Sequence, residues 1–328
     1  MAKVRSKLVF GLVLAFFLFC GTTVAREFTF EFHREIPVGE NPTLFLSNVS
    51  GKVTIRSHSL EKVIVDALKV VKTESSEKAE EVAEKLKIEI EKDGEEVSIR
   101  TEYPKGRLLR KVSAWVNYQI SVPSDTRLNV KTTSADVQIE GIAEKVRVST
   151  VSGDLQAENV SGVVDFSSVS GDVFLTDIQA DLVLEGTSSD IELEQVKGQI
   201  RIGCVSGDVG LSGTEGDVEI STTSGDIEVD QSQGRLDLYS ISGDVQVKTR
   251  IKPEFEYSIE TTSGDILLYL PEDSDATLEC ETQSGSIRAQ IPLNLLSTSR
   301  NLLRGELGSG GVRINLSSVS GDIKVRGY

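Results

Sequence analysis

Apolar and polar residues alternate in short stretches that recur every 18 residues from about residue 126 onward. The stretch IEV (Ile227–Val229) is followed one period later by VQV (Val245–Val247). A second apolar position recurs earlier in each period, at Val148, Phe166, Leu184, Ile202, Ile220 and Leu238. Alternation with a period of two is typical of β-strands that have one buried and one solvated face. The pattern therefore predicts two short strands in every period.

The tripeptide Ser-Gly-Asp stands at the same place in nearly every period. Its aspartates, including those of two variant copies, are Asp136, Asp154, Asp172, Asp190, Asp208, Asp226, Asp244, Asp265 and Asp322. The first seven are 18 residues apart, steps of 21 lead to Asp265 and then to Ser286, and 36 residues separate Ser286 from Asp322. Self-similarity at a fixed spacing indicates a solenoid.

These repeats predict an all-β fold, a right-handed parallel β-solenoid with two strands in each 18-residue coil. Each strand would pair with its counterpart about 4.8 Å away, so that two sheets face each other across a thin apolar core. We expect this flattened solenoid over residues 126–328, with a non-repeat insertion at about 290–311. In that arrangement Val173, Ile191 and Val209 form one column.

The Ser-Gly-Asp corner has to reverse the chain within a few residues. Serine and aspartate bond to nearby backbone groups in such turns, and glycine tolerates left-handed dihedral angles. Ala135 and Ser189 replace the glycine in two coils, which favours small size over positive φ as the requirement. The alternative is Ca²⁺ bound between coils, but one regular aspartate per coil supplies few of the roughly 6 to 8 oxygens of a Ca²⁺ site. We predict a structural turn ladder without catalytic, cofactor or metal residues.

Residues 26–125 lack the period and are predicted to form a small α+β cap. The stretch SSEKAEEVAEKLKIEI (75–90) begins with serines that can cap a helix and carries apolar residues at helical spacing. A variant corner, Ser50-Gly51-Lys52, predicts an isolated early coil in this region. We expect the cap to shield the edge of the first repeat, because bare strand edges invite aggregation.

Two features stand out near the C-terminus. The insertion Gln290–Gly311 is apolar, carries Arg300 and Arg304, and ends in glycines. We expect it to fold over the side of the solenoid, and the alternative is an element that faces lipid or a partner. The final coil INLSSVSGDIKVRGY leaves little chain to cover its edge. That edge is therefore a candidate for self-association.

Residues 1–25 are predicted to be a signal peptide. Lys3, Arg5 and Lys7 precede the apolar run LVFGLVLAFFLFC, which is short for a membrane span, and small residues lead to a cleavage point after Ala25. The alternative is an uncleaved anchor, which alone would attach the protein to a membrane. We therefore expect an exported protein that is periplasmic, displayed on the cell surface or secreted.

The net charge of −16 becomes −19 without residues 1–25, because that segment holds three basic and no acidic residues. Such a charge opposes binding to nucleic acid and to anionic lipid. His33 and His58 are the only histidines, and the chain shows neither a Ser/His/Asp set nor metal-ligand spacing of Cys and His. The composition thus argues against nucleic-acid binding and against catalysis.

Cys204 and Cys280 are the only cysteines that follow the signal segment. Both fall on inward positions, about four coils or roughly 19 Å apart at the strand spacing of a sheet. A disulfide needs Cα atoms within about 7 Å. We predict two free, buried thiols.

The coils SVSGDV and TTSGDI, the segment NYQISVP and the closing INLSSVSGDIKV resemble the bacterial putative-adhesin β-strand-repeat family of unknown function. The resemblance spans roughly residues 40–328 and implies a β-solenoid at the cell envelope. It implies no site residues, because the family has no established active site.

The expected function is that of a non-catalytic envelope or cell-surface scaffold that binds a glycan or protein partner. One alternative is a structural protein that assembles end to end through the C-terminal coil. The other is a β-helix enzyme that acts on polysaccharides. Outward residues mix charges without a cluster, which disfavours the enzyme; they are Arg147, Asp165, Arg201, Glu219 and Asp237.

Overall fold

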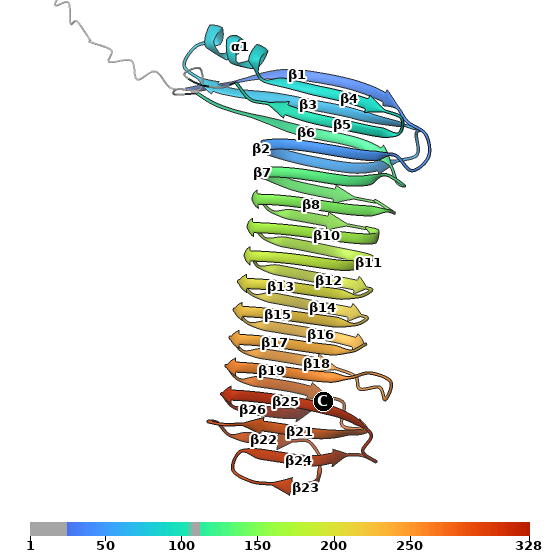
Figure 1. Cartoon of the computed structure of the whole chain (residues 1–328), viewed down its shortest axis with the longest axis vertical. Helices are drawn as coiled ribbons and strands as arrows, with labels where there is room; N and C mark the ends of the chain where they lie inside the picture. Colours follow the sequence, from blue (N-terminus) through green and yellow to red (C-terminus); the bar gives the residue numbers. More distant parts are fainter. Residues whose placement is uncertain (1–24, 105, 107–111) are drawn as a thin grey trace, which may run out of the picture.

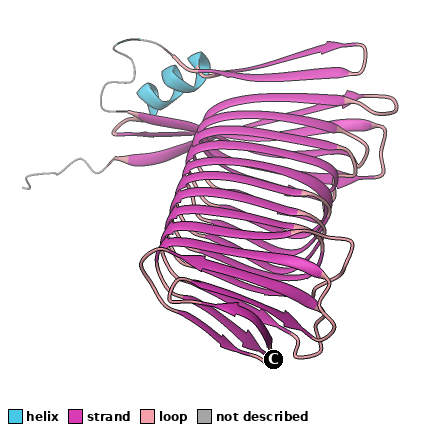
Figure 2. Ribbon diagram, turned by 60° about the horizontal axis from the view of Figure 1, so that its bottom comes forward, coloured by secondary structure: helices cyan, strands magenta, loops and turns pink. Residues whose placement is uncertain are grey.

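The computed structural model describes residues 25–104, 106 and 112–328 as a long rod of stacked strands (Figure 1). The predicted signal peptide lies outside the described residues, apart from Ala25. Each coil of the rod gives one strand to each of two facing sheets (Figure 2). Apolar side chains from both sheets fill the space between them, including Phe166, Ile227 and Val229, each about 1% exposed.

The first sheet contains, in spatial order, β8 (Lys145–Ser152), β10 (Ser161–Ser170), the second half of β11 (Val173–Ser188), β13 (Ile200–Ser206), β15 (Val218–Ser224), β17 (Leu236–Ser242), β19 (Tyr257–Ser263), β25 (Val312–Ser320) and β21 (Ala276–Thr282). The second sheet contains β9 (Leu155–Glu158), the first half of β11, β12 (Ile191–Lys197), β14 (Val209–Glu215), β16 (Ile227–Gln233), β18 (Val245–Thr249), β20 (Ile266–Leu270), β26 (Ile323–Gly327) and β22 (Ile287–Gln290).

The predicted register is confirmed. Val173 pairs with Ile191, and Ile191 pairs with Val209, so the three residues form one buried column. All pairs between successive coils in this part of the rod are parallel. The all-β solenoid with 18-residue coils is therefore the observed fold.

The variant corner at Ser50-Gly51-Lys52 forms the first coil of the solenoid. It lies within β2 (Thr43–His58), which pairs in parallel with β7 (Arg127–Glu140) so that Lys52 stands opposite Asp136. The expectation of an isolated coil is wrong, because β2 stacks directly on β7. The two strands are about 70 residues apart in the sequence, and the chain between them forms the N-terminal extension. The solenoid thus includes residues 43–58, within the stretch assigned to the cap.

The remaining N-terminal elements extend both sheets beyond β2. On one sheet β5 (Glu96–Glu102) pairs with β2 and β4 (Lys87–Asp93) follows. On the other, β6 (Ser113–Pro123), β3 (Lys62–Thr73) and β1 (Arg26–Pro37) follow in that order.

A single helix lies beside this N-terminal extension. The helix α1 (Ser76–Lys85) begins at Ser75, whose side chain accepts a hydrogen bond from the backbone N–H of Lys78 at 3.3 Å. Its buried face packs beside Val71 of β3. The predicted capped helix therefore forms, and its apolar face covers part of the extended sheet.

The C-terminal coil is not the last coil of the rod. β25 pairs with β19 on one side and with β21 on the other, and β26 lies in the same way between β20 and β22. After β20 the chain skips one coil position and forms β21 and β22 in the position beyond it. It then returns to form β25 and β26 in the skipped position. Both edges of the C-terminal coil are therefore occupied, which corrects the expectation of an open edge there.

The insertion covers the end of the solenoid rather than its side. It contains β23 (Asn294–Thr298) and β24 (Leu302–Leu307), and β24 pairs antiparallel with β21. Ile291, Leu293 and Leu303 pack against the end of the core. The expectation of a loop over the side is wrong, because the exposed apolar end of the last coil needs a cover.

Both thiols are free and buried, as predicted. The inserted coil places Cys204 and Cys280 five coils apart instead of four. Burial raises the pKa of the Cys280 thiol to about 12 from its ordinary value of 9.0.

The position of the C-terminal coil predicts its hydrogen exchange. Amides of β26 should exchange as slowly as those of the interior strand β16, although they lie within a few residues of the C-terminus, because β26 is paired on both sides. Amides of β22, which has a partner on one side, should exchange faster. Mass-spectrometric hydrogen exchange measures both, and fast exchange throughout β26 would contradict the inserted position.

The thiols should resist alkylation in the folded protein. At pH 8 iodoacetamide should label neither Cys204 nor Cys280 until denaturant is added, because both are buried and burial raises their thiol pKa. The neutral Cys280 thiol favours folding below pH 9, and this contribution is lost as the pH rises toward 12. Mass analysis of the alkylated native protein tests the first point, and a Cys204–Cys280 bridge would overturn it.

Candidate functional site

The aspartates of the recurring motif form one continuous row along a corner of the rod. In each case the Oδ1 of one aspartate accepts the backbone N–H of the residue at the same place in the next coil. The donor–acceptor distances are 2.8–3.3 Å, and the row runs Asp136, Asp154, Asp172, Asp190, Asp208, Asp226, Asp244, Asp265, Asp322 and Ser286. All nine predicted ladder residues are thus brought together, with Asp322 between Asp265 and Ser286.

The hydrogen bonds give the row a structural role. At a corner the regular strand pairing is interrupted, and an unpaired backbone N–H is unfavourable. The carboxylate provides the missing acceptor, and these bonds offset the repulsion between stacked charges. The N–H of Ser286 contributes most to lowering the pKa of Asp322 below its ordinary value. Among the described residues, no three Asp, Glu, His or Cys side chains are grouped as a metal site would require.

The glycine of the corner allows successive coils to approach closely. Gly171 has φ of 153°, and a Cβ at that position would lie 2.2 Å from the carbonyl oxygen of Gly153 in the preceding coil. The same close contact recurs along the corner, for example between Gly225 and Gly207. Positive φ is not shared by every corner, because Gly264 and Gly321 make the same close contact without it. Small size is therefore the common requirement, as Ala135 and Ser189 indicate.

The exception at Ser189 is compensated within its own coil. Gly186 stands where neighbouring coils have threonine, serine or cysteine, and a Cβ on Gly186 would lie 3.0 Å from the Cβ of Ser189. The Ser189 side chain therefore occupies the space that a larger residue fills in other coils. Glycine at position 186 and serine at position 189 therefore depend on each other, because only one of the two positions has room for a side chain.

Beside the aspartate row the second sheet has a hollow of about 860 Å³. It extends across β9, β11, β12, β14 and β16. Gly210 and Ser212 form its floor where neighbouring coils carry larger outward side chains. Phe174, which is 43% exposed, lines the hollow. Regular stacking thus leaves a depression wherever a coil has small outward residues.

The hollow is strongly acidic. Seven carboxylate side chains line it, namely Asp154, Asp172, Asp190, Asp208, Glu192, Glu228 and Asp230. None of the described residues that line it is basic, and only Asp230 of this set forms an ion pair, with Lys248 at 2.9 Å. The carboxylates of the aspartate row and those of the outward glutamates therefore surround the same hollow and make it negatively charged.

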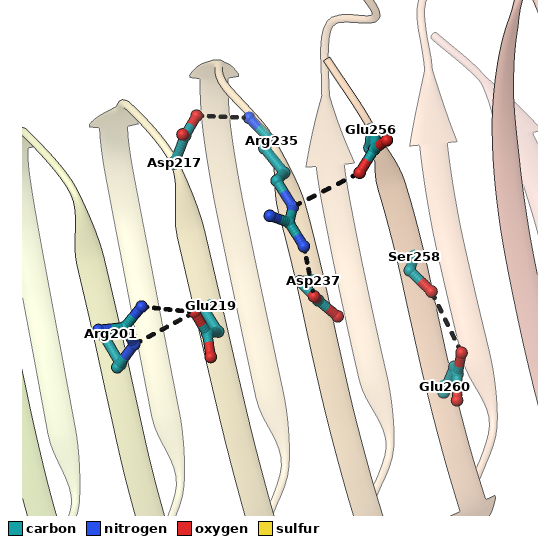
Figure 3. A network of polar contacts seen from close by, with 8 residues as sticks. All are labelled: Arg201, Asp217, Glu219, Arg235, Asp237, Glu256, Ser258 and Glu260. Carbon is teal, nitrogen blue, oxygen red and sulfur yellow. Dashed lines mark hydrogen bonds and ion pairs between the residues drawn. The ribbon is translucent and has the colours of Figure 1, made fainter.

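The opposite face of the rod has a different charge pattern, because acidic and basic side chains pair between coils (Figure 3). Arg201 reaches Glu219 of the next coil at 3.0 Å, and Arg147 reaches Asp165 of the next coil at 2.6 Å. Arg235 pairs within its own coil, with Asp237 at 2.8 Å. The five outward residues expected to mix signs lie on this face and are Arg147, Asp165, Arg201, Glu219 and Asp237. The ion pairs distinguish this face from the second sheet, where the carboxylates of the hollow gather.

The two histidines do not complete a catalytic set in the described residues. His33 lies 2.6 Å from Asp66, but both side chains are largely exposed and no serine or cysteine lines the adjoining surface. His58 accepts the backbone N–H of Leu60 through Nδ1. Sequence analysis identified the aspartate row but missed the hollow, whose signal is the small outward pair Gly210 and Ser212.

These features define the class of protein as a β-solenoid repeat protein with one acidic and one charge-paired face. The chain belongs to the Toastrack DUF4097 family, whose model matches residues 41–230 and 214–326. The expected resemblance to a bacterial family of β-strand repeats is confirmed. No curated protein matches the chain.

Two solved structures are similar over most of the chain. One, described as a "putative cell adhesion protein" from Clostridium sporogenes ATCC 15579, is 11% identical and covers 92% of this chain and 100% of its own, with a TM-score of 0.23. The other, a "putative adhesin" from Bacteroides fragilis NCTC 9343, is 12% identical and covers 90% of this chain and 96% of its own, with a TM-score of 0.37. Within the described residues, no helix has the length and apolar character to cross a bilayer.

The close contact of glycines at the corner predicts a position-specific effect on stability. Gly171→Ala should destabilise the protein by about 2 kcal/mol or more, because the new Cβ meets a backbone carbonyl and φ is positive. Gly203→Ala is the matched control, since a Cβ there meets nothing within 4 Å. Thermal and denaturant unfolding monitored by circular dichroism compare the two, and equal stability would contradict this account of the corner.

Proposed function

We propose that the chain is a non-catalytic binding scaffold, exported to the cell envelope or cell surface, whose acidic hollow holds a cationic segment of a protein or glycan partner. The observation that carries the proposal is the hollow of about 860 Å³ with its seven carboxylates. The repeated outward positions of the Toastrack DUF4097 solenoid support a binding role, because they provide an extended regular surface.

The charges of the hollow favour a partner with amino or guanidinium groups. Six of its seven carboxylates have no ion pair in the described part of the chain, so an incoming cation displaces no basic side chain from them. A cleft lined by one sign of charge also concentrates counter-charged ligands and speeds their association. The expected partner is therefore cationic over a length of several coils.

Phe174 adds an apolar element to this recognition. Its ring is exposed beside the outward acids of β12, where a cation can contact an aromatic face and a carboxylate together. Solenoids provide extended surfaces of this kind because every coil repeats the same outward positions. The proposed function thus uses the regular stacking that also makes the rod stable.

A binding experiment tests the site directly. A fluorescent oligolysine peptide and an oligosaccharide of glucosamine with free amines serve as probes, and their N-acetylated forms serve as neutral counterparts. Glu192→Gln and Glu228→Gln should each weaken binding of the amine probes about two- to fivefold, since each removes one exposed charge. Phe174→Ala should have an effect of similar size.

Matched variants on the opposite face separate local from overall charge. Glu260→Gln and Glu281→Gln change the net charge equally but lie on the first sheet, so binding should stay unchanged. The peptide and oligosaccharide arms show which partner class fits, and a parallel series with EDTA tests whether Ca²⁺ takes part. Equal binding of acetylated probes, or equal loss in the opposite-face variants, would overturn the proposal.

A further inference from the structure

The second sheet ends, at the N-terminal end of the rod, in a long strand with one open edge. Among the described residues this strand, β1, pairs with β3 alone (Figure 1). It has 12 residues in a continuous register, and its only proline is the last residue. The other strands with an open edge at the ends of the sheets are shorter, with 7 residues in β4, 5 in β23 and 4 in β22. A long regular edge without bulges or internal prolines readily pairs with a further strand.

The backbone groups at the open edge of β1 belong to alternate residues. Val38, directly after β1, donates its backbone N–H to the carbonyl oxygen of Glu61, directly before β3, at 3.1 Å. Successive residues of a strand direct their N–H and C=O groups to opposite edges, so the even-numbered residues of β1 bond to β3. The N–H and C=O groups that point to the open edge are therefore those of Glu27, Thr29, Glu31, His33 and Glu35.

The N-terminal part of the chain is nearly neutral, unlike the repeated coils. Residues 26–125 hold 18 Asp and Glu against 16 Lys and Arg, whereas residues 126–285 hold 31 against 10. Two of the three acids of β1 also form ion pairs with lysines of β3, at 3.3 Å and 2.9 Å. A second copy of the chain can therefore approach this end without the repulsion that the acidic coils would cause.

We propose that β1 pairs antiparallel with β1 of a second copy across a two-fold axis at Phe32, so that two rods join at their N-terminal ends. In this register Glu31 lies opposite His33 of the second copy. On the apolar side of the strand, Phe32 meets its own counterpart, and Phe30 meets Arg34, which is exposed and has no ion pair among the described residues. Aromatic pairs and opposite charges across strands stabilise a sheet, and the odd-numbered residues add about eight backbone hydrogen bonds.

Neighbouring registers place like charges opposite each other. A two-fold axis at Phe30 would put Arg26 opposite Arg34. An axis at Glu31 or at His33 would put two glutamates opposite each other. Like charges directly opposite in a sheet are destabilising, so the proposed register is the one of these four that the charges of β1 favour.

The helix α1 and the acidic hollow are both compatible with this pairing. The helix packs on the apolar side of β1, beside Phe28 and Phe30, and forms no strand pair with it. The hollow lies on the outward face of the same sheet, so a two-fold axis perpendicular to the sheet places both hollows on one side of the joined rods. Two such sites bind a multivalent partner more tightly than one. The pairing of β1 itself does not rest on the binding function proposed above.

Sedimentation velocity over a series of protein concentrations tests the pairing. It uses the full chain and the form that begins at Arg26, and both should show a monomer–dimer equilibrium. Thr29→Pro removes an N–H that points to the open edge and is not used by β3, so it should give a monomer with an unchanged circular dichroism spectrum. Thr29→Ala is the matched control, since it keeps the N–H, and it should still dimerise.

Charge variants test the register without a proline. His33→Glu places two glutamates opposite each other at two symmetric sites and should weaken the dimer about three- to tenfold. Adding Glu31→Lys should restore the dimer, because the lysine then faces the introduced carboxylate of the second copy. A monomer at every concentration, a dimer that persists in Thr29→Pro, a dimer that requires residues 1–25, or no restoration in the double variant would each overturn the proposal. The first of these outcomes would leave the open edge to a strand of a different protein.

Discussion

From Asp136 onward, each coil of this solenoid is joined to the next by an aspartate that accepts a backbone N–H where the strand ladder is interrupted. The bond requires the corners to approach closely, which glycine permits, as the contact between Gly171 and Gly153 shows. Once one corner is in place it presents the same acceptor and the same space to the following coil. The regular rod, its thin core and its parallel sheets all follow from this repeated contact.

The same interaction also shapes the surface. Since every carboxylate of the row uses Oδ1 inside the stack, its charge stays at the edge of the second sheet, next to outward Glu192 and Glu228. On the first sheet, arginines at matching positions of neighbouring coils neutralise the acids, as Arg201 does with Glu219. One repeat thus produces two faces of different chemistry.

Periodicity allowed much of this to be predicted. The column through Val173, Ile191 and Val209 and the nine stacked aspartates follow from spacing, because equal intervals on a solenoid become neighbours. The order of the last coils did not follow from spacing. Ser286 and Asp322 are 36 residues apart, an interval that fits either order, since similar coils offer similar edges. The position of the first coil was missed for a related reason, as its partner β7 lies far away in the chain.

The amino-acid sequence by itself determined the coil length, the inward column of apolar residues and the corner motif, because these depend on local alternation and on turn chemistry. Only the tertiary structure decided that the C-terminal coil is inserted between two earlier ones, since that choice depends on which exposed edges meet. It also decided where the acidic hollow lies. The hollow arises from small and charged side chains in different coils that stacking brings together, and no local stretch contains it.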